Sequence, residues 1–207
     1  MAVSDNPTVQ RYYRSNLALS AAVERALAQA GTRAAVEAIL RAYAEAAIAD
    51  AHDYYLAMRL DAGVRGRFRM PVETPNREQW DASLDWAMQQ PETALLGVGQ
   101  RLVANAGRGQ ILAGIRADAK ARRWARVTSA TGCAFCRMLA TRGAVYRSEE
   151  SADFRAHDHC GCTIEPLFGG RYEPPAHVRA DQQLWAESTD GLSGGDALNA
   201  FRRAVGA

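Results

Sequence analysis

The chain has 207 residues, of which 48% are hydrophobic and 23% are charged, and its formal net charge is +2 at pH 7. This length predicts one domain, or one domain with an attached helical arm, with enough apolar residues for a packed core. No stretch approaches 18 consecutive apolar residues and the first residues lack a signal-peptide pattern, so we expect no membrane association. In a reducing compartment, the four cysteines are more typical of a metal site than of two disulfides.

The first 60 residues carry two helical patterns. Apolar residues within 8–30 recur with the period of a helix, and Gly31 can end it. Thr32 is expected to cap a second and longer helix, which ends before Gly63. Many residues of its apolar stripe are alanine, which favours helix and lets another helix approach closely. We predict a long helical hairpin, or an arm that packs on a partner.

The next segment contains the signals of a loop and further helices. Residues 63–76 include two glycines and two prolines among three arginines, which predicts a solvated connecting loop. Asn76 is expected to cap a short third helix, and Pro91 to begin a fourth. Gly107 and Gly109 are expected to interrupt that helix, with a fifth amphipathic segment after them.

The sequence pattern changes at residue 123. Alternating runs predict short strands in "RWARVTS", "GAVYRS" and "CTIEPLF", and "CAFCRMLATRG" predicts a short helix that begins at a turn. After a linker-like stretch, the C-terminus carries two more helical patterns. We therefore predict a mainly α fold in three parts: a helical region or arm (1–122), a small α+β metal-binding module (123–170), and a C-terminal linker with helices (171–207).

The predicted module contains all four cysteines and two of the four histidines. A Cys-x2-Cys turn lets two thiolates converge on one ion, and the later cluster supplies further donors. Structural zinc takes four sulfur or nitrogen ligands in a tetrahedron. We predict a structural zinc ion, with ligands drawn from Cys133, Cys136, His157, Cys160 and Cys162. Because a module of about 50 residues has a small core, the metal would contribute much of its folding free energy.

The spacing leaves the ligand set open. Three cysteines are expected in any set, namely Cys133, Cys136 and Cys160. Cys162 and His157 compete for the fourth position. The His159 side chain either points away from the metal or contacts a metal ligand without binding the metal itself. Asp158 is expected to hydrogen-bond a ligating imidazole and to fix its tautomer.

Other interpretations of the cysteines and histidines remain. The cysteines can also be reduced thiols in a small core, or a redox-active CxxC pair. A catalytic zinc needs an open position for water, whereas five or six donors favour a closed site. The H-x-E of zinc deaminases and the H-E-x-x-H of metalloproteases are absent. His52 is expected on a helix surface or partly packed, and His177 in a loop, and we expect neither to act as a general base.

The module also resembles a known family. The sequence "VTSATGCAFCRMLATRGAVY", followed by "AHDHCGCTIEPLF", resembles the C-terminal module of the phage Mu F-like minor head proteins, in the version found in tailed phages of actinobacteria. The resemblance covers about residues 120–170, and "GLSGGDALNAFRRA" is similar to the tails of the actinophage members. His159 and Gly161 stand where Asn and Arg are commoner in that family.

This resemblance implies a minor capsid protein of phage head morphogenesis. Such a protein has a structural and interaction role in the virion, at the inner face of the capsid, after assembly in the host cytoplasm. The implied partners are the portal protein, with several copies around its ring, the major capsid or scaffold protein, and packaged DNA. Some actinophage relatives are labelled capsid maturation proteases, and the His-Asp-His triplet resembles that of treble-clef nucleases. A metal-dependent nuclease or a capsid maturation protease is therefore the alternative.

Overall fold

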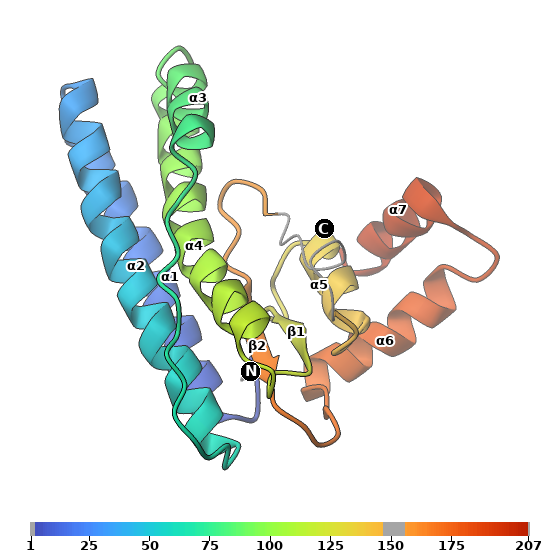
Figure 1. Ribbon diagram of the computed structural model, residues 1–207. Coiled ribbons are helices and arrows are strands. Elements are labelled where there is room, and N and C mark those ends of the chain that lie inside the picture. Colours follow the sequence, from blue (N-terminus) through green and yellow to red (C-terminus); the bar gives the residue numbers. More distant parts are fainter. Residues whose placement is uncertain (1–2, 147–155, 207) are drawn as a thin grey trace.

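The computed structural model describes residues 3–146 and 156–206, and the fold is mainly α (Figure 1). The elements in chain order are α1 (Pro7–Leu27), α2 (Arg33–Asp61), α3 (Arg77–Ala87), α4 (Glu92–Ala117), β1 (Arg123–Val127), α5 (Ala134–Thr141), β2 (Thr163–Leu167), α6 (Ala176–Ser188) and α7 (Gly194–Ala204). Helices α1 to α4 lie side by side, and α5 to α7 lie on the other side of the two short strands (Figure 1). The predicted mainly α class is therefore confirmed, whereas the predicted boundaries at 122 and 170 stay a prediction.

The long helical hairpin forms where the caps predict it. Asn6 precedes α1, and its side chain accepts hydrogen bonds from two backbone amides of the first turn. The Thr32 hydroxyl accepts a hydrogen bond from the Ala35 amide and so begins α2. After α2, Gly63 adopts a φ of 66°, a left-handed conformation that suits glycine at a helix end. The pair is joined by the stacked rings of Tyr12 and Tyr54, whose centroids are 4.1 Å apart.

Helix α4 differs from the prediction. Gly107 and Gly109 lie inside one continuous helix of 26 residues rather than interrupting it. Gly107 faces α2, where an added Cβ would lie 3.2 Å from the Ala47 carbonyl oxygen. The glycine thus lets two helix backbones approach closely, and this packing outweighs the weak helix propensity of glycine.

The strands β1 and β2 form a two-stranded antiparallel sheet, in which Ala125 is opposite Glu165. The predicted strand in "GAVYRS" contributes a single bridge, between Tyr146 and Trp124. The rings of these two residues stack with centroids 4.2 Å apart. The end of that predicted strand, from Arg147, lies outside the described residues.

One hydrophobic cluster connects the helical region to the cysteine module. Its buried side chains include Val9, Tyr12, Tyr54, Tyr55 and Ile111 from the helices, and Trp124, Cys136, Cys160, Cys162 and Ile164 from the module. A second cluster lies among α1 to α4, and a third lies between α5 and the C-terminal helices. None of the helices that the structure describes is both long and apolar enough to span a bilayer.

Candidate metal centre

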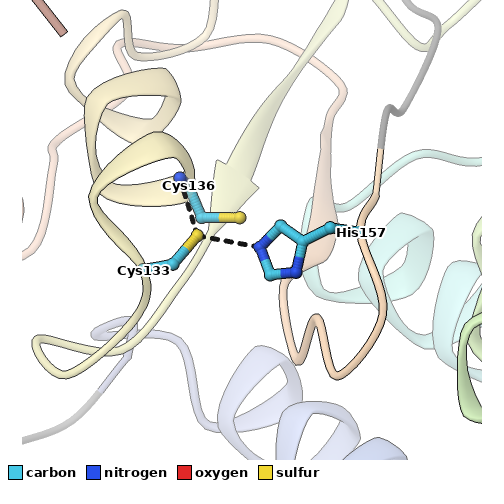
Figure 2. A group of neighbouring side chains, drawn as sticks. All are labelled: Cys133, Cys136 and His157. Atoms are coloured by element: carbon cyan, nitrogen blue, oxygen red, sulfur yellow. Dashed lines mark hydrogen bonds between the residues drawn. The ribbon is translucent and has the colours of Figure 1, made fainter. Parts of the chain in front are cut away.

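Two segments that are distant in sequence bring five potential donors together. Cys133 is the N-cap of α5, and Cys136 lies in the first turn of that helix. The Cys133 sulfur accepts a hydrogen bond from the Cys136 amide at 3.4 Å, so capping of the helix sets the geometry of the CxxC pair (Figure 2). His157, Cys160 and Cys162 lie in the segment that leads into β2.

The donor atoms form two groups that share Cys136. One group contains Cys133, Cys136 and His157, the other contains Cys136, Cys160 and Cys162, and within each group all donor atoms lie within 4.8 Å. Cys133 Sγ is 2.9 Å from His157 Nε2, and Cys136 Sγ is 3.6 Å from Cys160 Sγ. Zn–S bonds of about 2.3 Å in a tetrahedron place two sulfurs about 3.8 Å apart. The chemistry and spacing of these groups therefore suit a metal ion.

The turn at residues 157–160 orients the imidazole toward the sulfurs (Figure 2). The Cys160 amide donates a hydrogen bond to the His157 carbonyl oxygen, at 3.2 Å. His157 Nδ1 lies 2.6 Å from the Asp158 carbonyl oxygen. When Nδ1 donates its proton in this contact, Nε2 keeps a free lone pair for a metal. Asp158 thus hydrogen-bonds the imidazole as predicted, but through its main chain.

The Asp158 side chain and His159 contact the helical region instead. The Asp158 carboxylate forms an ion pair with Arg101 of α4, at 2.6 Å. His159 adopts a φ of 60°, and its Nδ1 lies 3.2 Å from Glu24 Oε1 of α1. His159 belongs to neither donor group, which agrees with both orientations that the sequence left open for it.

Two buried arginines border the cluster, and sequence reasoning missed both. Arg108 of α4 is 1% exposed, and its guanidinium donates hydrogen bonds to the carbonyl oxygens of Cys160 and Cys162. Arg126 of β1 places a guanidinium nitrogen 3.7 Å from Cys136 Sγ. Cations beside sulfur favour the thiolate, which is the form that binds metals. The available signal for Arg108 was a charged residue among the small and apolar residues of a predicted helix.

The thiols differ in their pKa values. Hydrogen bonding to Cys136, and then to His157, lowers the pKa of Cys133 to about 5. Hydrogen bonds from Cys136 and Cys162, together with the charge of Arg108, lower the pKa of Cys160. Hydrogen bonding to Cys133 and the other two cysteines raises the pKa of Cys136. Two sulfurs are thus anionic near neutral pH, and metal binding would release the remaining protons.

Comparison with known proteins gives one result. The family model of the VG15 protein matches residues 8–188, which include the helical region and both donor segments. The chain belongs to the VG15 protein family. This family is associated with phages, so the chain is a phage protein. No curated protein and no solved structure matches the chain.

In this VG15 family protein, the donor cluster opens on a pocket. Cys136, Cys160 and Cys162 are buried, whereas Cys133 is half-buried. A cavity of about 320 Å³ lies over the cluster, between residues of α1 and α4 and residues 128–132. The cluster therefore has a buried side, which faces the core, and an accessible side at the pocket.

The other two histidines of this VG15 family protein lie outside the donor groups. His177 is in the first turn of α6, not in a loop as predicted, and it is buried. Its Nε2 lies 2.9 Å from the Thr128 carbonyl oxygen, and the Thr128 hydroxyl is 3.7 Å from Cys162 Sγ. His52 lies on α2, beside Asp53, and is partly buried, as one of the two predicted alternatives has it. His177 thus fixes the loop between β1 and α5.

Proposed function

We propose that this VG15 family protein is a minor capsid protein that acts in the head morphogenesis of a tailed phage. Its role is structural, and a zinc-stapled module of the phage Mu F-like type fixes the shape that its partners bind. The convergence of thiol and imidazole donors from two distant segments carries this proposal. Membership of a phage-associated family supports it.

Zinc is the ion that this donor set favours. Thiolates and imidazole in a tetrahedral arrangement are the preferred ligands of zinc. We assign Cys133, Cys136 and Cys160 as ligands, and His157 as the fourth. The Nε2 of His157 already lies beside a sulfur, whereas the Cys162 thiol donates a hydrogen bond to Thr128. Cys162 remains a reserve donor, and this surplus leaves no coordination position for a substrate water, which supports a structural site.

The partners that we propose are the portal protein, the major capsid or scaffold protein, and packaged DNA. Several copies would surround the portal ring inside the capsid, after assembly in the host cytoplasm. The helical region offers exposed apolar side chains to such partners, including Leu60 in the last turn of α2 and Trp86 and Met88 at the end of α3. Large apolar and aromatic side chains of this kind are enriched in the cores of protein interfaces.

Co-expression with the portal and major capsid proteins of the same phage tests this role. We expect the protein to co-elute with the portal in size-exclusion chromatography. Replacing Trp86 and Met88 with Ala should weaken that complex, whereas Leu192→Ala, at an exposed site before α7, should not. In purified virions, mass spectrometry should find the chain, and intact heads should protect it from added protease. Absence from virions would contradict the proposal.

A metal-dependent nuclease or a capsid maturation protease is the second candidate, and one observation favours it. His159 borders the pocket over the cluster, and Glu24 holds its imidazole in the way that a carboxylate orients a general base. If the protein is such an enzyme, the zinc-loaded protein should cleave DNA or the capsid protein. His159→Ala should then abolish cleavage without loss of zinc or helicity. Absence of cleavage by the wild-type protein would reject this candidate.

A further inference from the structure

We propose that one basic surface of the molecule binds the phosphate backbone of duplex DNA. The basic surface consists of residues 59–73, from the end of α2 into the loop after it, and residues 116–123, from the end of α4 into β1. Both segments lie at the ends of these helices that are furthest from α3 (Figure 1). The inference rests on the proposed function for DNA being within reach of the protein, and it names the surface that the DNA contacts.

Arg59 joins the two segments of the basic surface. Its guanidinium forms an ion pair of 2.9 Å with Asp118 in the second segment. The same guanidinium donates hydrogen bonds to the carbonyl oxygens of Val64 and Gly66 in the loop. The Asp118 carboxylate also accepts a hydrogen bond from the Lys120 amide, at 2.9 Å. The loop after α2 and the turn after α4 are therefore held together as one surface.

The loop after α2 presents its arginines to solvent. Phe68 and Met70 pack against the core, whereas Arg67 and Arg69, which alternate with them, are exposed. Arg65 is exposed as well. In an extended chain, alternate side chains lie on the same side, about 6.6 Å apart. The loop thus suits a ligand that carries a series of negative charges rather than a single one.

The basic surface carries far more positive charge than the composition of the chain predicts. It contains eight Arg or Lys residues and three acids, a net charge of +5, whereas the whole chain has +2. Two of these acids already have cationic partners, because Asp118 pairs with Arg59 and Glu73 lies 3.4 Å from Arg116. The third acid, Asp61, is exposed. The remainder of the chain is negative overall, so the positive charge is localised.

Five of the cations are available to a ligand. They are exposed and form no ion pair with any residue in 3–146 or 156–206, and they are Arg65, Arg67, Arg69, Lys120 and Arg122. Arg123 instead donates a hydrogen bond to the Gly170 carbonyl oxygen. The carboxylates of Glu45 and Asp53, earlier in α2, line a separate pocket beside residues 72–75. A polyanion therefore meets five free cations and one free carboxylate on the basic surface.

The side chains of the basic surface favour DNA over an acidic face of another protein. Protein interfaces are centred on large apolar side chains, but Phe68 and Met70 of the loop pack inward, and the exposed Leu60 and Val72 lie on either side of residues 64–70. Guanidinium groups form bidentate hydrogen bonds with phosphate oxygens. Because clustered Arg and Lys release the counterions that DNA condenses, they bind it strongly at low salt. Phosphate contacts carry no sequence information, so we expect binding that is independent of base sequence.

Titration of the full, zinc-loaded chain into fluorescently labelled DNA tests the inference. Two duplexes of about 30 base pairs and unrelated sequence should bind with equal affinity in fluorescence anisotropy. If all five free cations contact phosphates, the logarithm of the binding constant should fall against the logarithm of the salt concentration with a slope of about −4.5.

Three sets of Gln substitutions locate the contact. The loop variant combines Arg65→Gln, Arg67→Gln and Arg69→Gln. The turn variant combines Lys120→Gln and Arg122→Gln. The control variant combines Arg14→Gln, Arg25→Gln and Arg41→Gln, at exposed positions of α1 and α2 outside the basic surface. The control variant changes the net charge as much as the loop variant does. All of these side chains are exposed, so helicity at 222 nm should match that of the wild type.

The loop variant should weaken DNA binding at least about tenfold and reduce the salt slope by about 2.7, and the turn variant should reduce the slope by about 1.8. The control variant should keep the wild-type slope. Absence of DNA binding at about 50 mM salt, or equal losses in the loop and control variants, would overturn the inference. A turn variant with wild-type binding would also overturn it, as would equally tight binding of polyglutamate, which would indicate an acidic protein partner. A chain that is found inside virions but does not bind DNA would reject only this inference and leave the proposed function standing.

Discussion

Cys133 combines two roles that other residues in this chain perform separately. Its sulfur caps α5, and the same sulfur lies beside the His157 imidazole at the accessible edge of the cluster. The lowered pKa of Cys133 keeps that sulfur anionic near neutral pH. The proposed metal binding and the start of a helix thus depend on one atom, and a substitution there should affect both.

Replacement of Cys133 with Ser should therefore remove zinc and destabilise the chain. Serine retains the ability to cap a helix but is a poor zinc ligand. The loss of stability in this variant therefore reports mainly the loss of the metal. We expect zinc affinity to fall by at least about 100-fold, measured by competition with a chromophoric chelator. Ser129→Ala, which changes a hydroxyl on the nearby loop, should retain full zinc occupancy. Full occupancy in Cys133→Ser would exclude Cys133 as a ligand.

The fourth ligand of the proposed zinc site can be identified with a matched pair of variants. We expect His157→Ala to lose zinc and Cys162→Ser to retain it, because His157 is already paired with Cys133 while Cys162 donates to Thr128. Metal analysis after dialysis against a weak chelator measures both. The reverse result would make the site a four-cysteine centre and leave His157 as a neighbour.

Glu165 should make stability depend on pH. Burial in β2, opposed by a hydrogen bond from Ser4 and assisted by Asp5, raises the pKa of Glu165 from about 4.5 to about 7. The folded state therefore holds a proton that the unfolded state releases, and this stabilisation is complete below about pH 4.5 and lost as the pH rises through 7. Between pH 5 and 8 the free energy of unfolding should fall by up to roughly 3 kcal/mol.

Glu165→Gln isolates that contribution. Glutamine has a similar shape and does not titrate, so the variant should show a smaller decrease in stability over the same pH range. Denaturant unfolding at pH 5 and pH 8, with zinc present, measures the difference between the two proteins. Identical pH dependence in both would show that Glu165 is not the group that titrates.

At the level of residues, the sequence predicted local features and missed tertiary ones. The five potential donors could be predicted to lie close together because their types and short spacings are visible along the chain. Arg108 could not be predicted, because α4 reaches the cluster only once the fold has formed. The ion pair of the Asp158 side chain could not be predicted for the same reason, because its partner Arg101 lies on the same distant helix.

At the level of elements, capping residues predicted correctly where helices begin, whereas glycines did not predict correctly where a helix is interrupted. Thr32 and Asn76 cap α2 and α3 as predicted, since a cap involves only neighbouring residues. The predicted break at Gly107 and Gly109 was wrong. Gly107 packs closely against α2, and this helix–helix contact keeps the glycine within a continuous helix. One sequence does not show which helix a glycine faces.

The two glycines of α4 should respond differently to alanine. At Gly107 a new Cβ would lie 3.2 Å from both the Ala47 carbonyl oxygen and the Tyr12 hydroxyl, which are fixed in the core. At Gly109 the neighbour is the flexible Glu73 side chain, also at 3.2 Å. Gly107→Ala should destabilise the chain by about 1–2 kcal/mol, because overpacking exceeds the gain in helix propensity.

Gly109→Ala is the matched control on the same helix. Here the gain in helix propensity should remain, so stability should be unchanged or higher by up to about 1 kcal/mol. Denaturant unfolding of both variants measures the difference. Equal effects would mean that α4 does not depend on a close approach to α2.

For the whole molecule, the core links the cysteine cluster to the helical hairpin. Cys136, Cys160 and Cys162 belong to the same hydrophobic cluster as Tyr54 and Tyr55 of α2. Arg108 adds a polar connection, because α4 holds the carbonyl oxygens of Cys160 and Cys162 directly. A structural change in the cysteine cluster should therefore affect the stability of the helices directly, because the two parts share one core.

Removal of the metal should consequently lower the stability of the entire chain in one step. If free zinc exceeds its dissociation constant by about a thousandfold, binding contributes about 4 kcal/mol, which for this length corresponds to roughly 10 °C in Tm. Calorimetry with a reductant should show a single transition that moves down when a chelator is added and returns with zinc but not with magnesium. Helicity at 222 nm and the near-ultraviolet signal of the tyrosines should be lost together. Two separate transitions, with the helices unaffected by the chelator, would instead mean that the module unfolds alone and that α1 to α4 form an independent domain.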